Sequence, residues 1–333
     1  PSNTPYAWND ASRNGSALFM VTFYLIAGFT LLFVGGEALV RGAVGAARAL
    51  DISPLLIGLT VVAMATSAPE LVVSLQAALD NKPSIAIGNV VGTNILLILG
   101  IAAIIAPLPC QRALVYRDGV MMVCGVALLT GLGYYGVIER WHGMAMLVAL
   151  AAFIVFTFLT EQRGHNGAAQ VHESEAEEVP SPPGGTVGAL ALLAIGLAML
   201  LFGAELLIYG ATETARGLGV SEAVIGLSLV AIGTSLPELA SVGIAAWRGH
   251  TEVALGTVIG SNIFNVFAIL GATSLVVPVP IDPQFTSVDL WVMLGSSVLL
   301  LPLMLSGAKL SRPEGALFLG TYVAYIGWLF AGG

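Results

Sequence analysis

Charged residues are scarce in this sequence. Asp, Glu, Lys and Arg make up only 10% of its 333 residues, whereas soluble domains carry roughly a quarter. Hydrophobic residues make up 57% of the chain and the mean hydropathy is +0.91. This composition indicates a polytopic membrane protein that has the lipid bilayer as its main partner.

Several other features are missing. The two cysteines, Cys110 and Cys124, fit no metal-binding spacing, and we interpret both as unpaired. No basic patch predicts binding to nucleic acid. The sequence lacks Gly-x-Ser-x-Gly and His-Glu-x-x-His motifs, and its four histidines lie in predicted loops or at span edges. Because these motifs are missing, we expect that the protein is not an enzyme and needs no cofactor.

Residues 1–16 have no basic n-region, so as written they do not form a signal peptide.

Ten segments are apolar enough to cross a membrane as helices, which takes about 20 residues each. They are 17–48, 53–79, 84–107, 117–137, 141–160, 185–216, 220–247, 251–277, 287–306 and 312–332. One long polar segment divides them into two sets of five, and an odd number of spans reverses the second set relative to the first. Halves of opposite topology are typical of secondary transporters. The expected fold is all-α, with ten transmembrane helices as two inverted five-helix repeats.

This division predicts four parts of the chain. They are an extracytoplasmic N-terminal tail (1–16), a first five-helix repeat (17–160), an acidic cytoplasmic linker (161–185) and a second five-helix repeat (186–333). The linker carries four glutamates followed by Pro-Ser-Pro-Pro-Gly-Gly. We interpret it as solvated and disordered, with a weak regulatory cation site as the alternative.

Lysine and arginine placement predicts the orientation, because cytoplasmic loops carry an excess of both. One side receives Arg41, Arg48, Arg112, Arg117, Arg163, Arg248, Lys309 and Arg312. The other side receives Arg13, Lys82, Arg140 and Arg216. The first side is therefore predicted to be cytoplasmic, which places both termini outside.

A polar motif recurs inside the apolar sequence. Thr-Ser-x-Pro-Glu ends at Glu70 and again at Glu238, 168 residues later, and residues 53–95 match residues 221–263 at 19 of 43 positions without gaps. Ionisable groups at membrane depth are costly and mark a functional site by default. Two copies suggest one site built from two halves.

The motif combines oxygen donors with a helix break. Pro69 has no N–H to give and frees the carbonyl of Ala65, so the second and seventh helices are expected to be broken. The freed carbonyls lie beside the hydroxyls and the carboxylate of each motif. Such hard oxygen donors suit Ca²⁺, and Na⁺ by the same logic. Two glutamates balance one divalent cation, and without it they need protons or monovalent cations, since unpaired buried charge is expensive.

The following span repeats as well. Gly88-x-x-x-Gly92-Thr-Asn-Ile returns as Gly256-x-x-x-Gly260-Ser-Asn-Ile. Small residues at this spacing let helices approach closely, so the polar residues after each second glycine could meet the broken helix. Plain helix packing is the alternative for Thr93, Asn94, Ser261 and Asn262.

These segments resemble the two α-repeats of the cation/calcium exchanger superfamily, which includes the sodium/calcium exchangers. Ala63–Glu70 with Gly88–Ile95, and Ala231–Glu238 with Gly256–Asn265, carry the resemblance. It implies a compact exchanger of a prokaryotic inner membrane, in which the first and sixth spans slide to alternate access. The metal-binding residues that it implies are Glu70, Glu238, Thr66, Ser67, Thr234, Ser235, the carbonyls of Ala63 and Ala231, Thr93, Ser261 and Asn265.

One position departs from the family pattern. Family members commonly carry Asn or Asp four residues after the hydroxyl, and Asn265 fills this position in the second copy. The first copy has Leu97 there. Either one ligand is missing, or Asn94 replaces it from a shifted helix. The departure leaves the coupling ion open.

A second acidic pair has the same offset. Glu37 and Glu205 occur in Gly-Gly-Glu-Ala-Leu and Gly-Ala-Glu-Leu-Leu. We interpret them as interfacial glutamates that pair with arginines such as Arg41. A role at the mouth of the ion path is the alternative.

The leading hypothesis is a secondary antiporter that exchanges Ca²⁺ for Na⁺, for which a monomer suffices. A proton-coupled antiporter of Ca²⁺ or another cation is the alternative, motivated by Leu97. A passive cation channel is less favoured, because a carrier needs the closed, two-sided site that paired glutamates in an inverted repeat provide.

Overall fold

Helices account for nearly all of the computed structural model, which describes residues 11–50, 52–99, 108–109, 112–163, 185–218, 231–306 and 309–330. The first half contains α1 (Ala11–Leu50), α2 (Pro54–Ile57), the π-helix η1 (Gly58–Val62), α3 (Ala63–Thr66), α4 (Ala68–Leu79), α5 (Pro83–Ile98), α7 (Arg112–Tyr135) and α8 (Arg140–Arg163). The second contains α10 (Gly185–Gly217), α12 (Ala231–Thr234), α13 (Leu236–Trp247), α14 (Thr251–Phe264), the π-helix η3 (Asn265–Leu270), α15 (Gly271–Val276), α16 (Gln284–Ser287), α17 (Asp289–Ser306) and α18 (Arg312–Phe330).

Five of the described helices are long and apolar enough to cross a membrane, and a sixth span results if the bent pair α2–α3 and α4 counts as one. Three further apolar helices, α5, α13 and α17, are shorter. All of them fall on segments expected to be membrane spans. The prediction of a helical, multi-pass membrane protein is confirmed.

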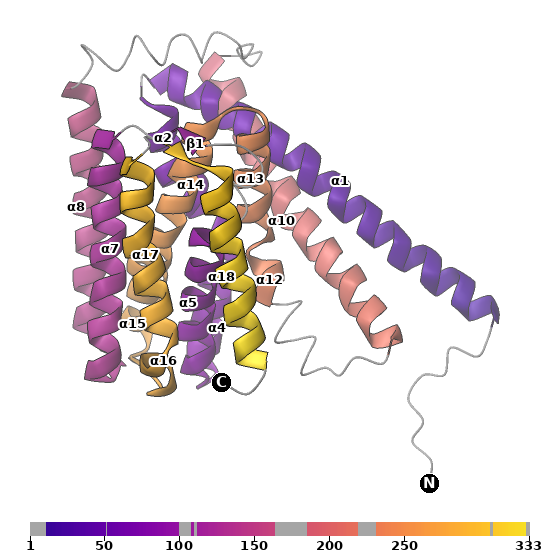
Figure 1. Cartoon of the computed structure of the whole chain (residues 1–333). Coiled ribbons are helices and arrows are strands. Elements are labelled where there is room, and N and C mark those ends of the chain that lie inside the picture. The colour runs from indigo at the N-terminus through magenta and orange to yellow at the C-terminus, as the bar shows by residue number, and fades with distance from the viewer. Residues whose placement is uncertain are drawn as a thin grey trace.

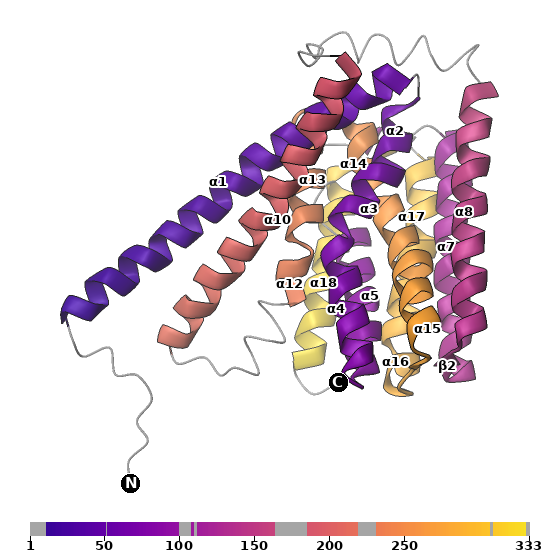
Figure 2. The same cartoon turned by 180° about the vertical axis from the view of Figure 1, so that it is seen from behind.

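Helices α1 and α10 lie side by side and cross the remaining helices obliquely (Figures 1 and 2). Their contact depends on glycine: a Cβ added at Gly196 would lie 2.3 Å from the backbone nitrogen of Leu39, and one at Gly35 would lie 2.9 Å from the carbonyl oxygen of Gly196. Such glycines recur every seven residues and match between the two halves: Gly28, Gly35, Gly42, Gly196, Gly203 and Gly210. The two helices therefore touch through their backbones.

Helix α14 forms the centre of the molecule. In the most apolar stretch of the span Thr251–Val276, 94% of the residues are buried, against 22% for the matching stretch of Phe19–Leu50 in α1. Gly260 of α14 lies against the broken helix of the other half, where an added Cβ would lie 2.3 Å from the carbonyl oxygen of Leu59. Gly256 makes the same kind of approach, 2.3 Å from the carbonyl oxygen of Leu55. The close packing predicted for the second glycine pair is confirmed. The same prediction for the first pair is wrong at Gly92, where an added Cβ would meet no described atom within 4 Å.

Both motif helices break just before their proline. Between α2–α3 and α4 the axis bends by 44°, and Ser67 at the break has φ −82° and ψ 7°. Ser235 occupies the same position before α13, with φ −88° and ψ 2°. Pro69 was expected in the middle of a helix, but it lies in the first turn of α4, where a missing N–H breaks no hydrogen bond.

Short strands join the two halves at the ends of the bundle. Strands β1 (Leu108–Pro109) and β4 (Lys309–Leu310) pair antiparallel, as do β2 (Val137–Ile138) and β3 (Val279–Pro280). Each pair takes one strand from each half.

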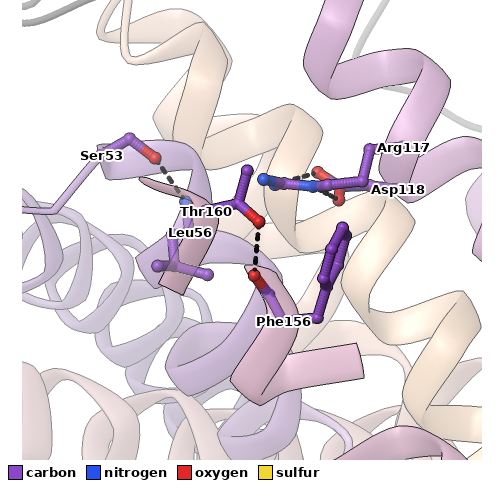
Figure 3. A network of polar contacts seen from close by, with 6 residues as sticks. All are labelled: Ser53, Leu56, Arg117, Asp118, Phe156 and Thr160. Carbon is purple, nitrogen blue, oxygen red and sulfur yellow. Dashed lines mark hydrogen bonds and ion pairs between the residues drawn. The ribbon is translucent and has the colours of Figure 1, made fainter. Parts of the chain in front are cut away.

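Polar contacts also gather at the end of the bundle where α2 begins (Figure 3). The Ser53 side chain accepts a hydrogen bond of 3.0 Å from the backbone N–H of Leu56 and caps α2. On α7, Arg117 forms an ion pair with Asp118, whose side chain is 1% exposed. Pairing offsets the cost of burying this carboxylate.

Two further sequence predictions concern the linker and the cysteines. Residues 164–184 of the linker lie outside the described residues, and so does Cys110. Cys124 is a free cysteine on α7, as predicted.

Candidate cation-binding site

Glu70 and Glu238 are the most deeply buried charged side chains at the helix breaks. Each lies in the first turn of its helix, α4 or α13, and each has a relative exposure of 0%. The positive end of a helix dipole lies at this turn and favours a negative charge there. The two halves thus each direct one carboxylate into the protein interior.

A hydrogen-bonded chain connects Glu70 with the second half. The Ser235 hydroxyl donates to the Glu70 carboxylate, with 3.2 Å between Oγ and Oε1. The Thr93 hydroxyl lies 3.0 Å from the same Ser235 oxygen. Three predicted site residues from α4, α5 and the break before α13 therefore meet.

The carboxylate of Glu238 faces the break of the first half in the same way. The hydroxyls of Ser67 and Thr66 interact with it electrostatically, and the Thr234 hydroxyl interacts with Glu70. Each glutamate thus faces the hydroxyls of the opposite motif, so the structure brings both predicted motifs together.

Backbone carbonyls lie next to these hydroxyls. The Thr66 hydroxyl donates to the carbonyl of Val62 at 3.0 Å and lies 3.4 Å from that of Ala63. Ala231 begins α12 as Ala63 begins α3, but its side chain is outside the described part of the chain. A carbonyl ligand at each position stays a prediction.

Many buried acceptor oxygens at this site lack a hydrogen-bond partner among the described residues. They are Glu70 Oε2, both carboxylate oxygens of Glu238, and the side-chain oxygens of Ser67, Ser261, Asn262 and Asn265. Buried polar atoms are normally paired, so this cluster calls for water or a cation. In the described chain no three His, Cys, Asp or Glu side chains gather in a metal-binding group. A cation here would take most of its ligands from neutral oxygens.

Asn265 begins the π-helix η3, which packs against both α4 and α5. Its amide nitrogen donates to the Asn94 side-chain oxygen at 2.9 Å. Leu97, the residue at the matching position of the first half, is buried and offers no polar group. Ser261 is fully buried one turn before Asn265. Asn94 thus bonds to Asn265 through its side-chain oxygen. That Asn94 replaces the missing ligand stays one of the two sequence predictions.

Two supporting residues escaped the sequence analysis. The Asn89 amide donates to the Glu70 carbonyl at 3.2 Å and to the Ser74 hydroxyl at 3.0 Å. The Ser241 hydroxyl donates to the Glu238 carbonyl at 2.9 Å. They occupy non-matching positions of the two halves, so the internal repeat gives no signal for either. Asn89 lies within the Gly88–Ile95 motif, which was the one available clue.

Glu37 has two partners at the periphery of this region. Its carboxylate binds Arg41 on α1 at 2.6 Å and Arg248 at the end of α13, also at 2.6 Å. The predicted pairing of Glu37 with Arg41 is confirmed. The guanidinium of Arg248 also lies 4.9 Å from the ring centroid of Trp247. Glu205, the matching residue on α10, is exposed.

Comparison with known protein families agrees with the arrangement of this site. The sequence model described as sodium/calcium exchanger protein matches residues 20–159 and 188–331. The chain belongs to the sodium/calcium exchanger family. The two matched segments leave out residues 160–187, most of which belong to the polar segment of the sequence.

Three known proteins align with nearly the whole length of this chain. The sodium/calcium exchanger MaX1 of Methanosarcina acetivorans is 30% identical over 343 residues, covering 92% of this chain and 97% of MaX1. The inner membrane protein YrbG of Escherichia coli is 32% identical over 318 residues, covering 94% and 98%. A solved structure of the sodium-calcium exchanger NCX_Mj superposes with a TM-score of 0.81 at 32% identity, covering 93% and 99%. The named exchangers are transport proteins rather than enzymes.

Proposed function

We propose that this protein is a secondary antiporter that exchanges Ca²⁺ for Na⁺ across a prokaryotic inner membrane by alternating access. The observation that carries the proposal is that Glu70 and Glu238 are fully buried and come from opposite halves, and that Ser235, at the break before α13, donates a hydrogen bond to Glu70. Two carboxylates neutralise one Ca²⁺ or two monovalent cations. An empty site would bury two unpaired charges, so the carrier returns loaded with counter-ions.

The proposed architecture is ten transmembrane helices in two inverted five-helix repeats, divided as the sequence predicts. The start of α1 and the end of α18 lie toward the same end of the molecule (Figure 1), as an even number of spans requires. We place this end outside the cell and the linker in the cytoplasm. The proposed site comprises the eleven residues that the family resemblance implies, and a monomer without cofactor suffices.

Calcium uptake into proteoliposomes tests the coupling ion. We expect vesicles loaded with sodium to take up Ca²⁺ when diluted into sodium-free buffer. Matched vesicles without sodium but with a pH gradient should not take it up. The reverse result would assign proton coupling, which Leu97 favours because it removes one side-chain oxygen from the site. Ca²⁺ uptake in vesicles that have neither sodium nor a pH gradient would identify a channel.

We further propose that α1 and α10 move as a pair and that Glu37 holds them in the present position. Its bridge to Arg248 connects α1 with α13, and the two partners are 18% and 41% exposed. Such partly exposed ion pairs contribute about 0.2–1 kcal/mol.

Replacing Arg248 by Met is therefore expected to change the exchange rate by up to about fivefold. Glu37→Gln should have an effect of the same direction. The double variant should add little to Glu37→Gln alone, because that change already breaks the bridge between Glu37 and Arg248. Exchange rates at low and high salt measure this, and effects that simply multiply would contradict a shared bridge.

A further inference from the structure

A chain of amide hydrogen bonds crosses from the first half to the second. Asn94 on α5 donates from Nδ2 to the backbone carbonyl of Asn262 on α14, at 3.4 Å. Asn265, at the start of η3, donates from Nδ2 to Asn94 Oδ1, at 2.9 Å. Asn94 and Asn265 are fully buried, with relative exposures of 0%. Both the NH₂ group and the oxygen of the Asn94 side chain thus form hydrogen bonds with the second half.

The first hydrogen bond fixes the direction of the second. A backbone carbonyl can only accept, so Asn94 must point its NH₂ group at Asn262 and its oxygen at Asn265. Asn265 must then turn its own NH₂ group toward Asn94. Its Oδ1 faces away from Asn94 and has no hydrogen-bond partner among the residues that the structure describes. An amide oxygen in this position can only accept, which is what a cation ligand requires.

The two halves differ at this point. Asn262 matches Asn94 in the repeat, yet its Nδ2 donates to the Val258 carbonyl of its own helix, at 2.7 Å. Its Oδ1 has no hydrogen-bond partner in the described residues. The side chain that could donate to it, by analogy with Asn265, is Leu97, which has no polar group. Among the described residues the directed amide pair therefore occurs only between Asn94 and Asn265, and Asn94 is its anchor.

We infer that Asn94 is a positioning residue that holds Asn265 with its oxygen toward the transported cation. The inference rests on the proposed function and adds a residue that acts through another. It also explains how the site gains an oxygen ligand without a third negative charge. The protein groups of the site then carry a total charge of −2, which comes from Glu70 and Glu238.

The test is a double-mutant cycle on the concentration of Ca²⁺ that gives half-maximal exchange. Asn94→Ala leaves the Asn265 amide free to turn its NH₂ group to the cation, so this concentration should rise roughly tenfold while the maximal rate changes little. In an Asn265→Asp background the orientation no longer matters, because a carboxylate presents an oxygen on either side. There, adding Asn94→Ala should not raise the concentration, because it only removes an oxygen that would otherwise face the carboxylate.

Controls separate positioning from packing. Thr130→Val removes another buried hydroxyl, on α7, which bonds only its own helix in the described structure, and it should leave the Ca²⁺ dependence unchanged. If Asn94→Ala gives no folded protein, Asn94→Ser keeps a polar group too short to orient Asn265 and carries the same expectation. Equal factors in both backgrounds, or no rise with Asn265 present, would overturn the inference. A wild-type protein with neither exchange nor Ca²⁺-dependent thermal stabilisation would instead refute the proposed function.

Discussion

Glutamine at position 70 or 238 is expected to abolish calcium exchange. Each replacement removes one of the two negative charges that balance Ca²⁺ and leaves a neutral amide of nearly the same shape. Removing one partner of a buried charge pair costs several kcal/mol. We therefore expect calcium uptake by Glu70→Gln or Glu238→Gln to fall at least about 100-fold.

The thermal stability of the purified protein shows whether binding or folding has failed. Ca²⁺ should raise the melting temperature of the wild type, because a ligand that binds only the folded state stabilises it. Neither glutamine variant should show this rise. Without Ca²⁺ both should be at least as stable as the wild type, since an amide is cheaper to bury than a carboxylate.

Glu213→Gln is the matched control. Glu213 pairs with Arg216 on α10, and its side chain is 36% exposed. Neutralising it removes the same charge at a partly exposed position, so uptake should remain within about twofold of the wild type. Normal exchange in both Glu70→Gln and Glu238→Gln would rule out the proposed site.

The internal repeat made much of the site predictable. The offset of 168 between Glu70 and Glu238 identified both motifs, because an ionisable group duplicated at membrane depth has few uses other than binding. Hydropathy predicted where the helices lie, because a long apolar segment in a membrane must satisfy its backbone hydrogen bonds within a helix. Both signals are local in sequence and survive without any knowledge of tertiary contacts.

Contacts between residues of the two halves could not be predicted from the sequence. The bond from Ser235 to Glu70 joins residues 165 positions apart, and Asn89 supports Glu70 from a position whose counterpart, Thr257, has a different role. The π-helix that begins at Asn265 was not predicted either, since one extra residue per turn leaves no mark in composition. Asymmetry between the halves is therefore what a repeat-based prediction misses.

An alanine at position 260 is expected to destabilise the protein, although alanine favours helices more than glycine does. The added Cβ would lie 2.3 Å from the Leu59 carbonyl oxygen and 2.8 Å from the Ala63 Cβ. Both neighbours belong to the broken helix of the other half, where backbone cannot move aside easily. Forcing α14 away should cost about 1–3 kcal/mol, which a thermal unfolding measurement in detergent detects.

Gly131→Ala provides the opposite expectation on the same fold. Gly131 is exposed on α7, and an added Cβ would meet no described atom within 4 Å. Here only the helix preference of alanine acts, worth roughly 0.5–1 kcal/mol in favour of the folded state. The melting temperature should thus rise slightly for Gly131→Ala and fall for Gly260→Ala. A rise in both would mean that α14 does not touch the broken helix through its glycines. A fall for Gly260→Ala together with weaker calcium uptake would connect this packing with the ion site, because Ala63 and Ser261 flank the contact.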